Sequence, residues 1–305
     1  MRLGVLDVGS NTIHLQVMDA HVGARPTPTT NFKIELRLTE YLESNGRVSD
    51  VGISLLFAAI EKSLAHAKEF NTQEILAFAT SALREAKNGA AIVSRINENF
   101  DVDLQILSGQ DEARLTFLAV RRWLGWSAGK LLVLDIGGGS LELALGEDES
   151  PSAALSFALG AARLTRDFLI GDPYSSKSIS SLESHATQLL RNSLPNSIKN
   201  HGADRSVATS KTFRTLARLA NTWYGDSPKS LESNALIGMI PRLSEMSNSQ
   251  RSALPGVSAS RAPQILAGAI VAQEVMEILN INELEICPWA LREGLILKWL
   301  DWMEL

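Results

Sequence analysis

Two aspartates, Asp7 and Asp135, lie 128 positions apart in nearly the same stretch of sequence. "LGVLDVGSNTIHLQVMD" surrounds the first and "LLVLDIGGGSLELALG" surrounds the second. In both, an apolar segment leads to the aspartate, a turn of small residues follows, and apolar residues resume. Small residues let successive backbone N–H groups approach a ligand closely, so each turn is expected to form an anion nest. A carboxylate beside each nest predicts a Mg²⁺ site, because magnesium takes oxygen ligands.

Two ordinary β-hairpins with glycine turns are the alternative interpretation. The matched position of the aspartate in both copies favours the anion-binding interpretation. Glu142 follows Asp135 on the return strand and alternates with Leu141 and Leu143. It is therefore a candidate second ligand for metal or water across the hairpin, and a solvated strand face is its alternative.

A further anion seat is predicted at Thr80, Ser81 and Arg84, where a strand passes into a helix. Hydroxyl groups, free N–H groups at a helix start and an arginine one turn later suit an anion. The alternative is a helix cap followed by a solvated arginine.

The segment "SGQDEARL" begins a helix with two acids in its first turn. Ser108 and Asp111 have the spacing of a capping box, which gives Asp111 a structural role. Glu112 is not needed for the cap and points about 100° away on the helix. It can act as a general base on water, or it can simply complement the helix dipole.

The pattern of apolar residues predicts the elements that position these side chains. In the first half, strands are predicted over 3–8, 13–18, 33–38, 75–79 and 104–107. Helices are predicted from Ser49 or Asp50 to about 70, from about 81, and from 108 to about 125.

The second half repeats this order. Strands are predicted within 131–145 and over 153–158, 207–209 and 284–286, with helices over 161–168 and 179–194, from 212, from about 263 to 279, and from 290. Residues 125–130 are the best candidate linker. The sequence therefore predicts an α/β protein of two duplicated domains, 1–126 and 127–305, facing each other across a cleft.

Composition excludes several classes of protein. The chain has 305 residues, a net charge of -5 and one cysteine. No global basic field draws it to nucleic acid or to a membrane, and no apolar run approaches the ~20 residues of a membrane span. The early Asp7 argues against a signal peptide, and a lone cysteine suits a reducing cytosol, so a cytoplasmic location is expected. The histidines have no metal-ligand spacing, and neither a serine-hydrolase elbow nor a Walker loop is present.

Five segments together resemble a known family in order and spacing: "GVLDVGSNTIHLQV", "AFATSALREAKN", "ILSGQDEARLTFLAV", "LDIGGGSLELALG" and "REGLI". The chain resembles an exopolyphosphatase / guanosine pentaphosphate phosphohydrolase of the short form. That family belongs to the actin-like ATPase and sugar-kinase superfamily. The resemblance covers nearly the whole chain and implies two ribonuclease-H-like domains.

The resemblance also implies a hydrolase acting on phosphoric anhydrides, in which a Mg²⁺-assisted water (Mn²⁺ being possible) removes a terminal phosphate. It implies that Glu112 acts on the water and that Asp135 and Glu142 have catalytic metal or water roles beside the metal ligand Asp7. It implies that Thr80, Ser81 and Arg84 grip the terminal phosphate. The residues that it implies for the other phosphates are Ser10, Asn11, Thr12, Gly137, Gly138, Gly139 and Ser140.

Two departures from the family pattern affect the expected substrate. Ser210 and Lys211 stand where the family has a glycine, which argues against a nucleotide-binding turn and adds a positive charge. The sequence ends at Leu305 without the C-terminal HD-type region of long members. The lack of that region, together with the net charge of -5, predicts a short grip and a preference for short polyphosphate. The cations that could line the polyphosphate path are Arg163, Arg166, Lys211 and Arg214, with Lys33, Arg37, Arg218, Arg261 and Arg292 as further candidates.

Four functions remain to be weighed. Exopolyphosphatase is preferred, because these cations could line a path that suits a repeating anion, and cations scattered over the surface are the alternative. Guanosine pentaphosphate 5′-phosphohydrolase is the same chemistry on a nucleotide, and a regulator that binds guanosine penta- or tetraphosphate with little turnover would not need Glu112. A kinase is disfavoured by Ser210 and Lys211. A homodimer is the expected assembly.

Overall fold

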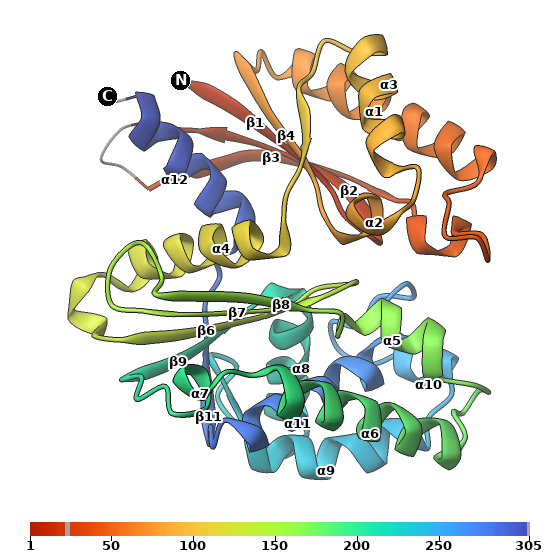
Figure 1. The fold of residues 1–305 in the computed structure, drawn as a ribbon, viewed down its shortest axis with the longest axis vertical. Helices are drawn as coiled ribbons and strands as arrows, with labels where there is room; N and C mark the ends of the chain where they lie inside the picture. Colours follow the sequence, from red (N-terminus) through yellow and green to blue (C-terminus); the bar gives the residue numbers. More distant parts are fainter. Residues whose placement is uncertain (22–24, 304–305) are drawn as a thin grey trace. The chain divides into compact units, whose positions relative to one another are not determined.

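The computed structural model describes residues 1–21 and 25–303 and confirms the α/β class. The chain divides into two compact units, each with its own sheet (Figure 1). Unit 1 comprises Met1–Leu115 and Leu291–Leu305, and unit 2 comprises Thr116–Ala290. No helix within the described residues is long and apolar enough to cross a membrane.

The sheet of unit 1 has five strands in the order β3-β2-β1-β4-β5. The first three pair antiparallel, whereas β1, β4 and β5 run parallel. These strands are β1 (Arg2–Val8), β2 (Thr12–Asp19), β3 (Thr27–Glu35), β4 (Glu74–Ala79) and β5 (Leu104–Ile106).

Helices cover both faces of this sheet. Because successive strand residues point to opposite faces, Leu6 and Val8 join one apolar cluster with α1 and α3, whereas Leu3 and Val5 join another with α12. The helices of unit 1 are η1 (Leu38–Tyr41), α1 (Asp50–Glu69), α2 (Ser81–Glu85), α3 (Gly89–Asn99), α12 (Leu291–Met303) and the start of α4 (Gly109–Leu124).

The sheet of unit 2 repeats the arrangement of unit 1. Its order is β10-β11-β9-β6-β7-β8, in which β6, β7 and β8 pair antiparallel and β6, β9 and β11 run parallel. Only the antiparallel edge strand β10 has no counterpart among the described strands of unit 1. The strands are β6 (Leu131–Ile136), β7 (Leu141–Gly146), β8 (Ala153–Phe157), β9 (Arg205–Thr209), β10 (Ser230–Glu232) and β11 (Glu283–Ile286).

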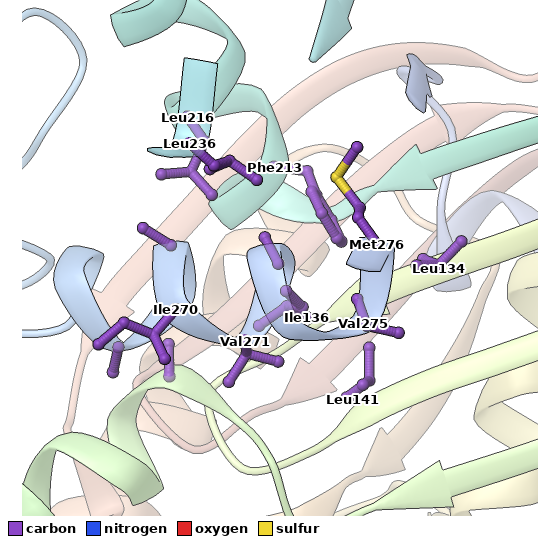
Figure 2. Packing of buried hydrophobic residues seen from close by; sticks show 14 of the residues in the cluster. Leu134, Ile136, Leu141, Phe213, Leu216, Leu236, Ile270, Val271, Val275 and Met276 are labelled. Atoms are coloured by element: carbon purple, nitrogen blue, oxygen red, sulfur yellow. The ribbon is translucent and has the colours of Figure 1, made fainter. Parts of the chain in front are cut away.

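The core of unit 2 is built around α11, which is apolar on nearly every side and correspondingly buried. Figure 2 shows its side chains among those of β6, β7 and α8, including Leu134, Leu141 and Phe213. The helices of unit 2 are η2 (Trp126–Ala128), α5 (Ala161–Phe168), α6 (Ser176–Ser193), α7 (Asn196–Lys199), α8 (Ser210–Tyr224), α9 (Ser233–Ser244), α10 (Asn248–Ser252) and α11 (Ile265–Ile278).

Two predicted elements differ from the structure. The third strand spans Thr27–Glu35 instead of 33–38, because Arg37 adopts a left-handed conformation and η1 follows it. The helix predicted from about residue 81 is two helices, α2 and α3. A Cβ at Gly89 would lie only 1.8 Å from the Leu83 carbonyl oxygen, so the start of α3 approaches α2 as only glycine permits.

The division of the chain also differs from the predicted 1–126 and 127–305. It falls within α4 at residue 115, ahead of the predicted linker. The last helix, α12, belongs to unit 1, because Ile296 and Leu300 are buried against Leu3 and Val5 of β1.

Candidate functional site

The candidate site of unit 1 lies at the carboxyl ends of three adjacent parallel strands. Ser10 follows β1, Thr80 and Ser81 follow β4, and Glu112 lies in the helix that follows β5. Ligands of open α/β sheets commonly bind at this edge. The fold therefore brings together residues from three separate segments that the sequence predicted to bind phosphate or act on water.

Hydrogen bonds tie these segments to one another. The hydroxyl groups of Ser10 and Ser81 lie 2.7 Å apart, and the Thr80 N–H donates to the Val8 carbonyl at 3.2 Å. All three predicted hydroxyl residues, Ser10, Thr80 and Ser81, are buried. This arrangement forms a compact cluster of hydroxyl groups that suits phosphate oxygens.

The two acids in the first turn of α4 have different surroundings. The Ser108 hydroxyl accepts a hydrogen bond from the Asp111 N–H at 3.1 Å and donates to the Asp111 carboxylate at 2.6 Å. Arg114 also donates to Asp111, whose side chain is 51% exposed. Glu112, by contrast, is only 8% exposed. The predicted pairing of Ser108 with Asp111 at the helix start is confirmed, and Glu112 takes no part in it.

Arg84 joins the hydroxyl cluster to Glu112. Its Nη1 donates to the Glu112 carboxylate and, at 3.0 Å, to the Leu107 carbonyl. Arg84 lies three residues after Ser81 on α2, and its N–H donates to the Thr80 carbonyl at 3.0 Å. A guanidinium and a nearly buried carboxylate therefore lie together, and the helix of Arg84 also provides Ser81.

The two repeated turns have the same hydrogen bond. The Gly9 N–H donates to the Thr12 carbonyl at 3.0 Å, and the Gly137 N–H donates to the Ser140 carbonyl at 2.9 Å. The intervening pairs are Ser10 with Asn11 in the first turn and Gly138 with Gly139 in the second. The duplicated sequence thus folds into duplicated turns.

The second turn is braced by α5. The N–H groups of Ala162 and Arg163 donate to the Gly138 carbonyl, and Arg163 Nε donates to the Gly139 carbonyl at 2.8 Å. A Cβ at Gly160 would lie 2.2 Å from the Gly139 carbonyl carbon, so only glycine permits this approach. These contacts fix the turn that was predicted to hold phosphate.

Asp7, at the end of β1, lies 3.9 Å from Arg292 at the start of α12. Burial raises the pKa of Asp7 to about 6, and the attraction of Arg292 offsets part of that rise. Its side chain nevertheless keeps 24% of its surface exposed. A desolvated carboxylate of this kind gains from an added cation or hydrogen-bond donor.

Asp135 and Glu142 lie directly opposite each other on β6 and β7. Opposite residues of an antiparallel pair project from the same face of the sheet, so the two carboxylates share a face. Glu142 is 5% exposed, and Ser156 of β8 donates a hydrogen bond to its Oε1 at 2.8 Å.

This donor set fits magnesium. Mg²⁺ is usually bound through one or two carboxylates together with substrate phosphates and water. Asp135 and Glu142 supply two carboxylates on one face, and the adjoining turn offers backbone N–H groups for phosphate. No group of three or more His, Cys, Asp or Glu side chains within 1–21 and 25–303 is placed to hold a metal.

The predicted path cations of unit 2 contact nearby groups. Arg163 contacts the Gly139 carbonyl, Arg166 contacts Asp167 at 2.7 Å, and Arg214 contacts the Ser210 carbonyl at 3.1 Å. Lys211 follows Ser210, whose φ of 75° is unusual for a residue with a side chain. The contacts place Arg163 and Arg214 at two different turns of unit 2.

Two partners of the site were not identified from the sequence. Ser156 positions Glu142, and Arg292, foreseen only as a path cation, faces Asp7. The strand alternation of residues 153–158 could have indicated that Ser156 lies on the same face as Glu142. No local signal links Arg292 to Asp7.

Comparisons with known proteins define the class. Residues 17–303 match the Ppx/GppA phosphatase family. Exopolyphosphatase 1 of Mycobacterium tuberculosis is 50% identical over 305 residues, which cover 99% of this chain and 89% of that protein. The solved Aquifex aeolicus PPX-GPPA enzyme is 25% identical, with a TM-score of 0.79 and coverage of 98% of this chain and 99% of that one. The Cytophaga hutchinsonii exopolyphosphatase is 24% identical and shares the fold, with a TM-score of 0.87 over 99% and 98% of the chains.

The protein is a hydrolase with a mixed α/β structure of the actin-like ATPase fold. The chain belongs to the Ppx/GppA phosphatase family. The resemblance noted in the sequence is thereby confirmed at the level of the family.

Proposed function

We propose that this protein is an exopolyphosphatase that releases terminal orthophosphate from inorganic polyphosphate by Mg²⁺-assisted attack of water. The family membership and the exopolyphosphatase relative at 50% identity support the reaction class. The observation that carries the proposal is the nearly buried Glu112 paired with Arg84, whose helix also provides Ser81 of the hydroxyl cluster. Glu112 is not needed for the helix cap, because Ser108 and Asp111 form it.

In this proposal Thr80, Ser81 and Arg84 bind the oxygens of the terminal phosphate. Ser10 joins them, because its hydroxyl group lies 2.7 Å from that of Ser81. Glu112 accepts the proton of the attacking water, a role that typically contributes ~10²–10⁴-fold in rate. The two glycine turns, with Asn11, Thr12 and Gly137 to Ser140, bind further phosphates through backbone N–H groups. Asp135 and Glu142, with Asp7 beside the first turn, would hold Mg²⁺ or Mn²⁺, which would neutralise the charge that develops on the phosphates.

We also propose a preference for short polyphosphate. The net charge of -5 provides no general attraction for a long polyanion, and each exposed ionic contact weakens with salt. Arg166 is paired with Asp167, and Arg163 braces a turn, so part of the cationic charge is already engaged. A grip of a few phosphates is expected. The homodimer and the cytoplasmic location stay predictions.

Guanosine pentaphosphate is the alternative substrate, because it offers the same terminal phosphate chemistry. Phosphate release should be measured side by side from long polyphosphate, short polyphosphate and guanosine pentaphosphate, each with Mg²⁺. The proposal expects the highest kcat/KM on short polyphosphate. A higher value on guanosine pentaphosphate would favour the nucleotide reaction, and absent turnover on all three would favour a binding role.

The variant that tests the role of Glu112 is Glu112→Gln. It keeps the size of the side chain and removes the base, so kcat should fall by ~10²–10⁴-fold while phosphate binding persists. Asp111→Asn is the matched control, because the exposed neighbour loses a charge outside the proposed site. It should lower stability by roughly 1 kcal/mol and keep most of the activity. A kcat for Glu112→Gln within about threefold of wild type would contradict the proposed role.

A further inference from the structure

Arg84 has two competing partners in the proposed reaction, the terminal phosphate and Glu112. It is expected to bind the terminal phosphate, yet in this structure its guanidinium is held by the Glu112 carboxylate and the Leu107 carbonyl. The ion pair is largely shielded from solvent, with side-chain exposures of 20% for Arg84 and 10% for Glu112. A shielded ion pair is weakened little by salt, so it persists until a competing anion arrives.

A terminal phosphate is such a competitor. It carries more negative charge than a carboxylate and matches the planar donor fork of a guanidinium at two points. Further donors for that phosphate are the hydroxyl groups of Ser81, on the same short helix as Arg84, and of Ser10, which follows β1 and lies 2.7 Å from the Ser81 hydroxyl. The phosphate therefore gains contacts that Glu112 alone does not provide.

The pairing also matters for Glu112. A carboxylate that shares its charge with a guanidinium attracts a proton less strongly, so it is a weaker general base than an unpaired carboxylate. Moving the guanidinium to the phosphate would restore the basicity of Glu112 at the moment when substrate is bound. Without substrate, the paired carboxylate is poorly suited to activate water.

We infer that Arg84 exchanges partners, from Glu112 in the free enzyme to the terminal phosphate in the complex, and that this exchange releases Glu112 to act on water. The inference rests on the proposed function and adds a substrate-gated base to it. Arg84 is thus a phosphate ligand and also the positioning residue that restrains Glu112. The Leu107 carbonyl keeps the guanidinium nearby in both states, since it accepts from the same Nη1 atom.

The exchange makes a prediction about binding that has a definite sign. Inorganic phosphate, which cannot be hydrolysed, is titrated into wild type, Glu112→Gln, Arg84→Met and the double variant, with affinity measured by calorimetry. If phosphate must displace Glu112, Glu112→Gln frees Arg84 in advance and should tighten phosphate binding by about tenfold, or ~1.4 kcal/mol. In the Arg84→Met background the same substitution should change affinity by less than about twofold.

Simple charge repulsion predicts the opposite pattern. Removing the Glu112 charge would then tighten binding at least as much in the Arg84→Met background, where no guanidinium screens it, and that result would overturn the exchange. Unchanged or weaker binding by Glu112→Gln would overturn it as well. Asp111→Asn is the matched control. Asp111 immediately precedes Glu112 and forms an exposed ion pair with Arg114, so its substitution should leave phosphate affinity unchanged.

Two further measurements keep the outcomes distinguishable. Circular dichroism checks that each variant folds, and Arg84→Lys replaces Arg84→Met in the cycle if the latter does not. With Arg84→Lys we expect a weaker coupling, of the same sign, between the substitutions at positions 84 and 112 in their effect on phosphate affinity. The absence of any coupling would overturn the exchange. Phosphate binding without coupling overturns the exchange and leaves the proposed function standing. If no variant binds phosphate and wild type releases none from polyphosphate, the proposed function fails together with the inference.

Discussion

The hairpins β1–β2 and β6–β7 have turns with the same hydrogen bond, but a different residue lies opposite the aspartate in each. Asp7 lies opposite His14, whereas Asp135 lies opposite Glu142. The partners on the third strand of each sheet also differ. His14 Nε2 lies 3.1 Å from Asn31 Oδ1 of β3, whereas Glu142 accepts a hydrogen bond from Ser156 of β8. An arginine, Arg292, also faces Asp7.

This difference separates two tasks that a duplicated turn can perform. Backbone N–H groups depend only on the turn, so both copies keep the capacity to bind an anion. A hard cation needs oxygen ligands, and only the second hairpin places two carboxylates opposite each other. In the first hairpin a histidine lies opposite the aspartate, and Arg292 of α12 lies 3.9 Å from its carboxylate. We therefore expect metal dependence to arise mainly from the second hairpin and phosphate binding from both.

The largest expected effect is the loss of activity on metal removal. EDTA should abolish phosphate release, and Mg²⁺ or Mn²⁺ should restore it better than Zn²⁺, because the predicted ligands are oxygen atoms. Asp135→Asn should raise the Mg²⁺ concentration for half-maximal activity more than Asp7→Asn does. Equal shifts would remove the distinction between the hairpins, and full activity in metal-free buffer would contradict the metal site altogether.

The next effect compares the residues opposite the two aspartates. Glu142→Gln should lower kcat by about 100-fold or more, since even outer partners of a bound metal contribute ~10–100-fold. His14→Gln, at the equivalent register of the first hairpin, should lower kcat by less than about tenfold. Steady-state kinetics on short polyphosphate at saturating Mg²⁺ measures both. A larger loss for His14→Gln would reverse the comparison.

A smaller effect on kcat is expected from substitutions on the neighbouring strands, β8 and β3. Ser156→Ala removes the hydrogen bond that orients Glu142 and should lower kcat by about tenfold, with thermal stability nearly unchanged. Asn31→Ala removes the corresponding partner of His14 and should change kcat by no more than about twofold. The pair of variants should be compared at several Mg²⁺ concentrations. If the defect of Ser156→Ala is independent of Mg²⁺ and matched by Asn31→Ala, Ser156 does not act through a metal ligand.

The smallest effect concerns stability and pH. The pKa of Asp7 is about 6 in the folded protein, above its ordinary value of 3.8, so the folded state binds the proton more tightly. Stability therefore falls as the pH rises through this window, and Asp7 destabilises the fold above pH 6. Asp7→Asn should raise the free energy of unfolding at pH 8 by about 1–3 kcal/mol and change it little near pH 4.

Asp19→Asn is the control of opposite sign for this measurement. A hydrogen bond from Arg2 lowers the pKa of Asp19, so its ionised form favours the folded state above the ordinary pKa. The substitution should therefore reduce stability at pH 8. Urea unfolding of both variants at the two pH values measures the signs. A loss of stability for Asp7→Asn at pH 8 would show that Arg292 outweighs the burial of Asp7.

Most of the fold could be predicted from the sequence because it depends on local periodicity. The short apolar runs in 3–8 and 131–136 and the helix cap expected at Ser49 or Asp50 concern neighbouring residues. The strands are confirmed, and the cap is Ser49. The third strand of unit 1 was misplaced, because the conformation of Arg37 ends it and no sequence pattern signals that change. The membership of α12 in unit 1 depends on packing between distant segments.

For the candidate site, too, local features could be predicted from the sequence, whereas contacts between distant segments could not. The sequence by itself indicated the two turns and the pairing of Ser108 with Asp111 at the start of α4, since glycine sterics, strand alternation and helix caps act over a few residues. Only the tertiary structure decided that Arg84 meets Glu112, that Arg292 meets Asp7 and that Ser156 orients Glu142. Each of those pairs joins segments whose proximity depends on sheet register and on the burial of apolar faces. Such contacts form only when the whole unit has folded, and so no local pattern specifies them.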